Sequence, residues 1–293
     1  MIGADFIFNN QMLSEYGMQM LDPENEQTWV NREIDKSEIT SVRPRPNHYG
    51  THYADTEKLP FLIMRDDEKY GIENMELNRY DINKIRTWLE SPKYPTAFEL
   101  IDDDERKVVY YGIVTDVHPF LVATRCYGIY FTLTCDSPYG YSQPIKNTLS
   151  YDSTADVNAM RLHVHSAEEN EYIYPKITLE LESGYNGAET VTVTNSNDGF
   201  RCMEVSFPYN ARKIVIDCQK KLITDGSGNL LPLESILTPE GTATSSPYLS
   251  MKNNSYYWLR LKPHENNISF TTDNDMLNYA TIEYQEIIKA GGF

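Results

Sequence analysis

The chain has 293 residues, with 26 Lys and Arg against 43 Asp and Glu, so its formal net charge is −17. The acidity is spread along the chain, because residues 1–146 hold 15 basic and 24 acidic residues and residues 147–293 hold 11 and 19. Without a basic stripe the chain is not expected to wrap nucleic acid through phosphate contacts, although an acidic surface could line a path that DNA slides past.

The first elements in chain order are a strand pair and an extended connection. Segment 9–21, "NNQMLSEYGMQML", fits a strand, a turn at Asn9-Asn10 and a second strand at least as well as a helix. Segment 41–60, "SVRPRPNHYGTHYADTEKLP", contains three prolines and mixed charge. A connection this long and irregular is usually functional. An arm that reaches a neighbouring subunit would explain it.

A short helix of about three turns is predicted to start at Asp81, whose side chain can cap its N-terminus. Its apolar face is formed by Ile82, Ile85, Trp88 and Leu89. The helix must stop before Pro92 and Pro95, which cannot continue it. We therefore interpret Trp88 as a core residue and not as an exposed platform for sugar stacking.

Three strands are predicted between this helix and the middle of the chain. They are "AFELI" (97–101), with Phe98 and Leu100 on one face, "KVVYYGIV" (107–114), apolar on both faces, and "GIYFTLTC" (128–135), with Ile129, Phe131, Leu133 and Cys135 on one face. Four consecutive acids, 102–105, separate the first two strands. Paired carboxylates catalyse glycoside hydrolysis when they flank a bond, but consecutive side chains splay apart, so this run is interpreted as a hairpin loop.

The segment "DSPYGYSQP" (136–144) interrupts the strand pattern and places a domain boundary near it, giving domains of 1–146 and 147–293. The second domain reads as an antiparallel β-sandwich of roughly 140 residues. Its predicted strands are "MRLHVH", "KITLEL", "TVTVTN", "RCMEVSF", "KIVIDC", "YYWLRL", "NISFTT" and "YATIEYQEI". Trp258 lies in "YYWLRL" and is also interpreted as core.

The sequence contains few groups that could carry chemistry. His163 and His165 share one face of a predicted strand, a spacing that can seat a metal, but no third ligand is fixed nearby. Cys126, Cys135, Cys202 and Cys218 form no C-x-x-C pair and are expected to be reduced and mostly packed, in a cytosolic chain. No nucleotide-binding or nucleophile motif is present. We therefore predict no catalytic residue, no metal and no cofactor.

Two parts of the chain resemble a known family. The segment 81–142, with its helix, its "YYGIV" strand and its "DSPYGYS" end, resembles the first domain of siphophage distal tail proteins, the hub or baseplate components of long non-contractile tails. "IVIDCQKKLITDGSGN" (214–229) and "WLRLKPHENNISFTTDNDMLNYATIEYQEIIKAG" (258–291) resemble the end of their second domain. One departure is His264, which stands where the family usually has glycine in a "PGxN" turn.

The resemblance implies a mainly β chain with an N-terminal ring-forming domain that has one short helix, and a C-terminal galectin-like β-sandwich. It implies a structural, non-enzymatic protein of the virion, assembled in the host cytoplasm. Six copies would form a hub ring that joins the tail tube protein to the tail-tip or baseplate proteins, and possibly to receptor-binding proteins. DNA would pass through this ring without specific binding, and no membrane would be involved.

Two alternatives remain open. The sandwich could be a carbohydrate- or receptor-binding module, which a cluster of exposed aromatic side chains on one face would favour. The chain could also be a β-rich glycan hydrolase that uses two acids distant in sequence, although no acid stands out.

Overall fold

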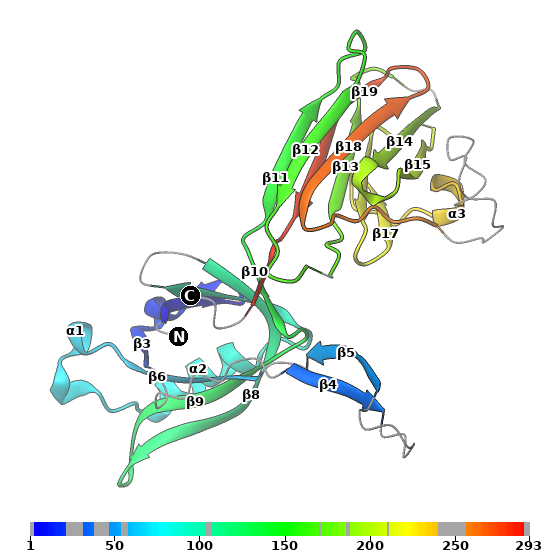
Figure 1. Cartoon of the computed structure of the whole chain (residues 1–293). Helices are drawn as coiled ribbons and strands as arrows, with labels where there is room; N and C mark the ends of the chain where they lie inside the picture. The colour runs from blue at the N-terminus through cyan, green and yellow to red at the C-terminus, as the bar shows by residue number, and fades with distance from the viewer. Residues whose placement is uncertain are drawn as a thin grey trace. The chain divides into compact units, whose positions relative to one another are not determined.

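Alternation of apolar and polar residues produces strands along most of the chain, as the computed structural model of the protein shows (Figure 1). The structure describes residues 3–21, 32–37, 47–53, 58–102, 107–169, 171–185, 188–209, 211–239 and 256–289. It divides into two units, one of residues 1–143 with 288–293 and one of residues 144–287. The mainly β prediction is confirmed.

The first unit is built on one nine-stranded sheet. Its strands are β1 (Gly3–Phe8), β2 (Gln11–Met12), β3 (Met18–Leu21), β6 (Lys58–Arg65), β7 (Thr96–Asp102), β8 (Lys107–Val122), β9 (Arg125–Cys135), β10 (Tyr139–Tyr141) and β20 (Ile287–Lys289). The main order is β2-β1-β7-β8-β9-β6-β3, and β10 pairs with both β8 and β20. The last strand of the chain therefore belongs to the first sheet, whereas the sequence assigned all of 147–293 to the second domain.

The predicted turn at the N-terminus is confirmed. Asn9 and Asn10 have φ values of 49° and 60°, in the left-handed region that asparagine tolerates, and they join β1 to β2. Ile7 pairs with Met12 across this turn. A 3₁₀ turn, η1 (Leu13–Tyr16), follows and leads to β3.

The predicted helix is α2 (Arg79–Glu90), but its N-cap is Asn78 and not Asp81. The Asn78 side chain accepts a hydrogen bond from the Asp81 N–H, and the Asp81 carboxylate accepts one from the Asn78 N–H, which makes a capping box. Asp81 is thus the third helical residue. Two shorter elements precede α2, namely α1 (Asp67–Tyr70) and η2 (Ile72–Asn74).

Aromatic rings hold α2 against the sheet. Phe6 of β1 stacks on Phe98 of β7 with ring centres 4.5 Å apart, and on Trp88 of α2 with ring centres 5.6 Å apart. The Trp88 indole N–H donates to the Phe8 carbonyl at 2.9 Å. Trp88 is 4% exposed and Ile85 and Leu89 are buried beside it. The interpretation of Trp88 as core is confirmed.

Two of the predictions from the sequence concern hairpins of the first unit. β7 and β8 are consecutive antiparallel strands, with Ile101 opposite Lys107, so the acidic run joins the two strands of a hairpin as predicted. Residues 103–106 themselves lie outside the described part. The segment 41–60 is less irregular than expected, because β5 (Asn47–Tyr53) pairs with β4 (Arg32–Ser37) in a separate two-stranded sheet. Residues 41–46 and 54–57 lie outside the described residues.

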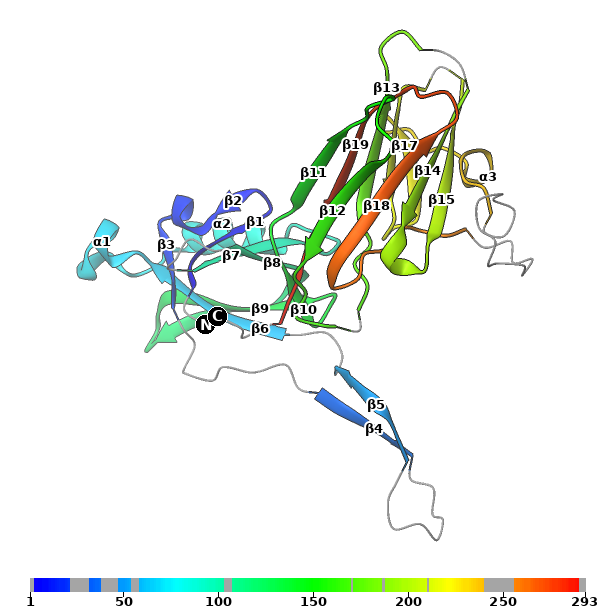
Figure 2. The ribbon, with the colours of Figure 1, turned by 45° about the horizontal axis from the view of Figure 1, so that its top comes forward.

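The second unit is a sandwich of two antiparallel sheets (Figure 2). One sheet has the order β11 (Ile145–Ser150), β19 (Leu277–Tyr284), β13 (Lys176–Leu181), β16 (Lys213–Asp217) and β17 (Leu222–Asp225). The other has the order β12 (Asn158–Val164), β18 (His264–Thr272), β14 (Glu189–Asn195) and β15 (Arg201–Phe207). Two short helical elements, η3 (Ser196–Asp198) and α3 (Leu233–Ile236), complete it.

One predicted strand of the second unit is wrong. "YYWLRL" (256–261) forms only an isolated bridge, between Leu261 and Ile173. Side-chain amides replace strand partners here, because Asn195 donates to the Arg260 carbonyl at 3.0 Å and Asn266 accepts from the Lys262 N–H at 2.9 Å. Trp258 is nevertheless 9% exposed, which confirms its interpretation as core.

The packing of Trp88 generates a first prediction. Trp88→Ala removes the indole from the aromatic core and leaves a cavity, so it should lower the free energy of unfolding by about 3–5 kcal/mol. Tyr80→Ala is the matched control, since Tyr80 lies on the same helix but is 75% exposed. Urea unfolding followed by circular dichroism measures both variants. Equal stability of the two would contradict the core role of Trp88.

Candidate functional site

Strands β8 and β9 form a long hairpin (Figure 1), and exposed apolar side chains lie at its end. Leu121 and Val122, at the end of β8, are 54% and 53% exposed. The hairpin register breaks between Thr115 and His118, where Asp116 adopts a φ of 53°, as expected of a β-bulge. Two adjacent aliphatic side chains in water favour contact with another protein surface.

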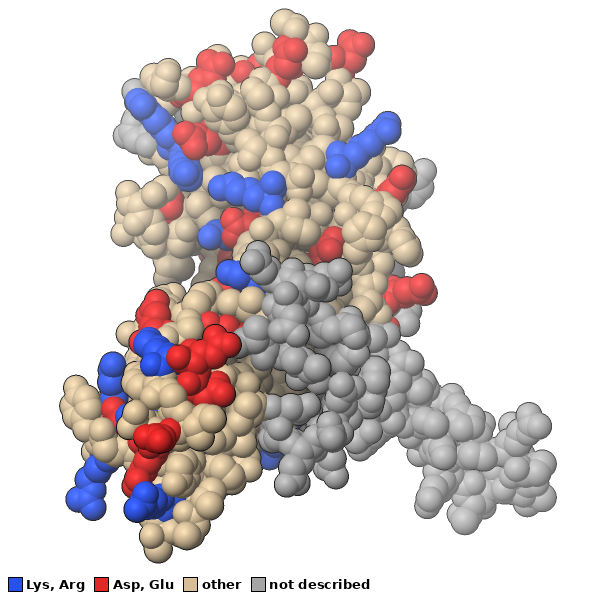
Figure 3. All heavy atoms as spheres, turned by 90° about the vertical axis from the view of Figure 1, so that its left-hand side faces the viewer, with Lys and Arg blue, Asp and Glu red and all other residues tan. Residues whose placement is uncertain are grey.

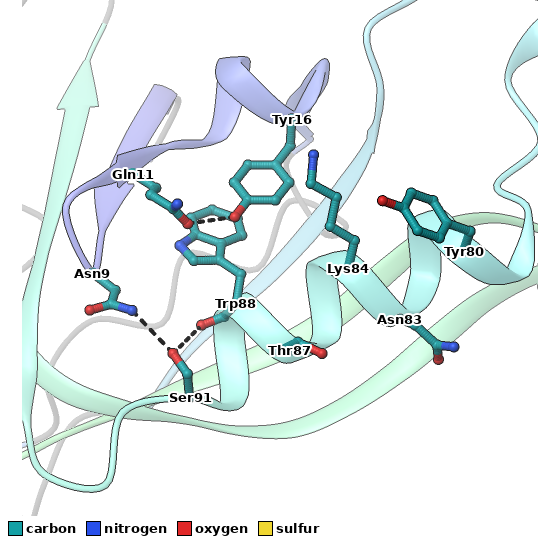
Figure 4. Close-up of a pocket in the computed structure, with 9 residues that line it drawn as sticks. All are labelled: Asn9, Gln11, Tyr16, Tyr80, Asn83, Lys84, Thr87, Trp88 and Ser91. Carbon is teal, nitrogen blue, oxygen red and sulfur yellow. Dashed lines mark hydrogen bonds between the residues drawn. The ribbon is translucent and has the colours of Figure 1, made fainter.

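A shallow hollow of about 480 Å³ lies between α2 and the β1–β2 turn (Figure 4). It is lined by Asn9, Gln11, Tyr16, Tyr80, Asn83, Lys84, Thr87, Trp88 and Ser91. Part of its rim is fixed, because the Asn9 amide donates to the Ser91 hydroxyl at 3.1 Å and the Lys84 ammonium lies 4.8 Å from the centre of the Tyr16 ring. None of these nine lining residues is a carboxylate, so they cannot supply an acid–base pair of the glycosidase kind.

The structure brings a third histidine to the predicted pair. The His163 and His165 ring centres are 4.5 Å apart, and the His264 ring centre lies 6.4 Å from that of His163. His264 opens β18, opposite Val164 of β12. Sequence reasoning missed this residue because 98 positions separate it from His165, and only the antiparallel pairing of β12 with β18 brings them together.

His264 adopts a φ of 75°, in the region that favours glycine. The turn therefore keeps the conformation expected of a "PGxN" turn although glycine is absent. A non-glycine residue in this region costs on the order of 1 kcal/mol. The turn is held by Asn266, which is 1% exposed and donates to the Lys262 carbonyl at 2.7 Å.

A buried ion pair joins η3 to segment 256–263. Asp198 is 4% exposed and accepts hydrogen bonds from Arg260 Nε at 2.7 Å and from the Tyr257 hydroxyl at 2.9 Å. Burial opposes ionisation of Asp198, but the hydrogen bonds from Arg260 and Tyr257 and the nearby Lys262 charge outweigh it and lower the pKa of this carboxyl below its ordinary value. The partners of the Asp198 carboxylate, namely Arg260, Tyr257 and Lys262, lie within the fold. We therefore assign a stabilising role to this ion pair.

The described residues offer no preformed metal or nucleophile site. No group of three or more His, Cys, Asp and Glu side chains among them is arranged to hold a metal ion. No disulfide joins the four cysteines, and burial raises the pKa of the Cys126 and Cys218 thiols, which makes them poor nucleophiles. Within the part of the chain that is described, no helix has the length and hydrophobicity of a membrane span.

The second unit does not gather its most exposed aromatic side chains into one platform. Phe200, 65% exposed, precedes β15, and Tyr209, 74% exposed, follows it, so the two lie at opposite ends of that strand. Tyr279, 43% exposed, belongs to β19 in the other sheet. Among the described residues these three therefore cannot stack on a single sugar chain.

The N-terminal part of the chain matches a known protein family. Residues 1–137 match the family described as phage tail protein N-terminal domain. Over these residues, fewer than half of the 293, the chain is similar to phage tail proteins. This match supports a place for the protein in the virion tail. A search of curated proteins by sequence gave no match.

Solved structures share the fold of this tail protein over its whole length. The Dit protein (gp 19.1) of phage SPP1, a paradigm of the hub adsorption apparatus in phages that infect Gram-positive hosts, has 12% identity and a TM-score of 0.61, covering 97% of this chain and 98% of that one. A chain of the phage P2 baseplate in its activated conformation with Ca has 9% identity and a TM-score of 0.55, covering 98% of both chains. At these identities the similarity establishes the fold.

The Asp198 ion pair generates a second prediction. Asp198→Asn removes the charge that pairs with Arg260 and should lower the free energy of unfolding at pH 7 by about 1.5–3 kcal/mol. Because the folded-state pKa of Asp198 lies below the ordinary value of 3.8, its contribution is complete above that pH and is lost as the pH falls through the folded pKa. The difference between wild type and variant should therefore shrink below about pH 4.

Urea unfolding at pH 7 and pH 3 measures this difference. Glu180→Gln is the control, since its pair with Lys213 is about half exposed on both sides and should contribute about 0–1 kcal/mol. A difference for Asp198→Asn that is equally large at both pH values would show that shape and not charge is what the carboxylate supplies.

Proposed function

We propose that this phage tail protein is the distal tail hub, and that six copies form a closed ring through the first unit. The similarity to SPP1 Dit over 97% of the chain is the observation that carries the proposal. Ring formation needs a heterologous interface, in which two different surfaces of one copy meet their counterparts on its neighbours. The first unit offers two surfaces of this kind.

The β4–β5 sheet is the first of these surfaces. It consists of two strands alone, and such a hairpin is at best marginally stable in water. Contact with a neighbouring copy would supply the packing that two strands lack. The second surface is the end of the β8–β9 hairpin, where Leu121 and Val122 would leave water on contact with a partner.

The ring would stack on the tail tube protein and carry the tail-tip or baseplate proteins, with receptor-binding proteins as further candidate partners. The role is structural and non-enzymatic. In support, Asp198 is paired within the fold, and the Cys126 and Cys218 thiols are buried. A sugar-binding sandwich is the less favoured alternative, because Phe200 and Tyr209 lie at opposite ends of β15.

Assembly supplies the third prediction. Light scattering on the purified full-length protein should give a mass of about 200 kDa, six times the 33.8 kDa of one chain. Leu121→Glu combined with Val122→Glu should shift the protein to monomers, because both side chains are exposed and a charge there opposes burial in an interface. Leu222→Glu in the second unit, where Leu222 is 44% exposed, is the control and should keep the ring.

A full-length protein that remains a monomer at high concentration, even when tail tube protein is added as a template, would sink the ring proposal. A ring that persists in the Leu121 and Val122 variant, with wild-type mass, would leave the ring intact but remove the hairpin end from its interface.

Passage of DNA supplies the fourth prediction. A bore lined by acidic side chains of the first domain, which carries 15 basic and 24 acidic residues in 1–146, would repel phosphate and limit friction. On the face presented in Figure 3, Lys and Arg side chains are interspersed with Asp and Glu, so that face does not carry charge of one sign. Only charges within about 8 Å of the DNA act at physiological salt, so the bore itself decides the matter.

The measurement is an electron-microscopy map of the assembled ring, together with fluorescence anisotropy of a DNA duplex at low salt. We expect an acidic bore and no binding of the duplex. A bore lined mainly by Lys and Arg, or tight salt-dependent binding, would contradict the prediction.

A further inference from the structure

The three histidines at one end of the second unit have no role in the assembly described above. His163, His165 and His264 are all exposed, and the three rings gather although they come from two different strand ends. Imidazole nitrogens bind divalent transition metals such as Zn²⁺, Co²⁺ and Ni²⁺, whereas Ca²⁺ and Mg²⁺ prefer oxygen. A cluster of three imidazoles therefore offers the nitrogen ligands that these transition metals prefer.

We infer that His163, His165 and His264 form a surface site for one divalent transition-metal ion, which would bridge β12 and β18. This site is separate from the proposed ring. The prediction of no metal rested on the lack of a third ligand close to His163 and His165 in the sequence. The pairing of β12 with β18 supplies that ligand.

The two ring-centre distances given above approach the distance that coordination of one metal ion requires. With Zn–N bonds of about 2.0–2.1 Å and tetrahedral geometry, two coordinated imidazole ring centres lie about 5 Å apart. His163 and His165, at 4.5 Å, are already close to this value, and His264 must approach His163 by roughly 1–2 Å from its present 6.4 Å. The three rings are not yet arranged around one point, so binding requires them to turn.

The hydrogen bonds shown for His165 and His264 in the described part of the chain do not oppose such a turn. The hydrogen bonds made by His165 and His264 involve their backbone groups, with the His165 N–H donating to Glu286 and the His264 carbonyl accepting from Asn266. The exposed rings are therefore free to change rotamer. Glu265, which faces His163 across the strand pair, could supply an oxygen as a fourth ligand.

The strained backbone at His264 supports the metal site independently of the ring distances. At a φ of 75° glycine would be unstrained, so the histidine destabilises its own turn. Strained backbone of this kind is concentrated at functional sites, where the side chain has a use that offsets the strain. Metal binding by the His264 imidazole is a use that the neighbouring rings of His163 and His165 make possible.

The test uses the untagged full-length protein, and Co²⁺ and Zn²⁺ as probes. Titration calorimetry should show one Zn²⁺ per chain, and Co²⁺ should produce a visible absorption band that EDTA removes. His163→Ala combined with His165→Ala should weaken binding at least tenfold. His118→Ala removes an exposed histidine of the first unit, which stacks on Tyr130, and should leave binding unchanged.

His264→Gly separates a ligand from a merely structural residue. It should weaken Zn²⁺ binding at least tenfold and at the same time raise the melting temperature of the metal-free protein by about 2–4 °C, because glycine relieves the strained turn. Absence of Zn²⁺ and Co²⁺ binding, or binding that survives loss of His163 and His165, would overturn the inference. A His264→Gly variant that binds Zn²⁺ like the wild type would also overturn it.

Discussion

Stacking of the Trp88 indole between Phe6 and Tyr16 is the interaction on which the first unit depends. The ring centre of Trp88 lies 5.6 Å from that of Phe6 and 4.4 Å from that of Tyr16, and the indole N–H donates to the Phe8 carbonyl. One side chain thereby fixes α2 against β1 and against η1. The nine-stranded sheet needs this cover, since one of its faces carries Phe6, Phe98 and Phe131, which would otherwise meet water. The β8–β9 hairpin, which the assembly would use, belongs to this sheet.

The second unit buries a segment that is not part of a regular strand. Residues 256–261 have few strand partners, yet Tyr257, Leu259 and Leu261 are buried. Buried polar side chains meet the backbone groups of this segment, with Asn195 bonded to both the Arg260 carbonyl and the Asn266 side chain. The Asp198–Arg260 pair adds a charged anchor. This network specifies one path for the chain, because any shift would leave amide or carboxylate groups buried without partners.

A hub protein, as proposed above, would act through its surfaces. Its conspicuous groups are apolar at the hairpin end and imidazole at the end of the β12–β18 pair. The first kind gains free energy by leaving water, and the second by exchanging water for a metal ion. Both are suited to joining parts. The histidine site and the ring are independent proposals, since they lie on different units and use different chemistry.

The sequence by itself determined the local structure wherever a residue's role depends on near neighbours. The period of 3.6 over 82–89 gave α2 and its buried face, and alternation gave the buried faces of β9, β12 and β13, because side-chain direction follows directly from backbone geometry. The resemblance carried by 81–142, 214–229 and 258–291 predicted a phage tail protein. Even here the cap was misassigned, since Asn78 and Asp81 are both good capping residues and only the reciprocal hydrogen bonds distinguish them.

Only the tertiary structure decided which distant residues meet. The strand-like pattern of 256–261 did not make a strand, because Asn195 and Asn266 took over the hydrogen bonds that a neighbouring strand would have made. Likewise, β20 joined the first sheet by pairing with β10. The approach of His264 to His163 depends on the register between β12 and β18, and no local pattern encodes a register between strands about 100 residues apart.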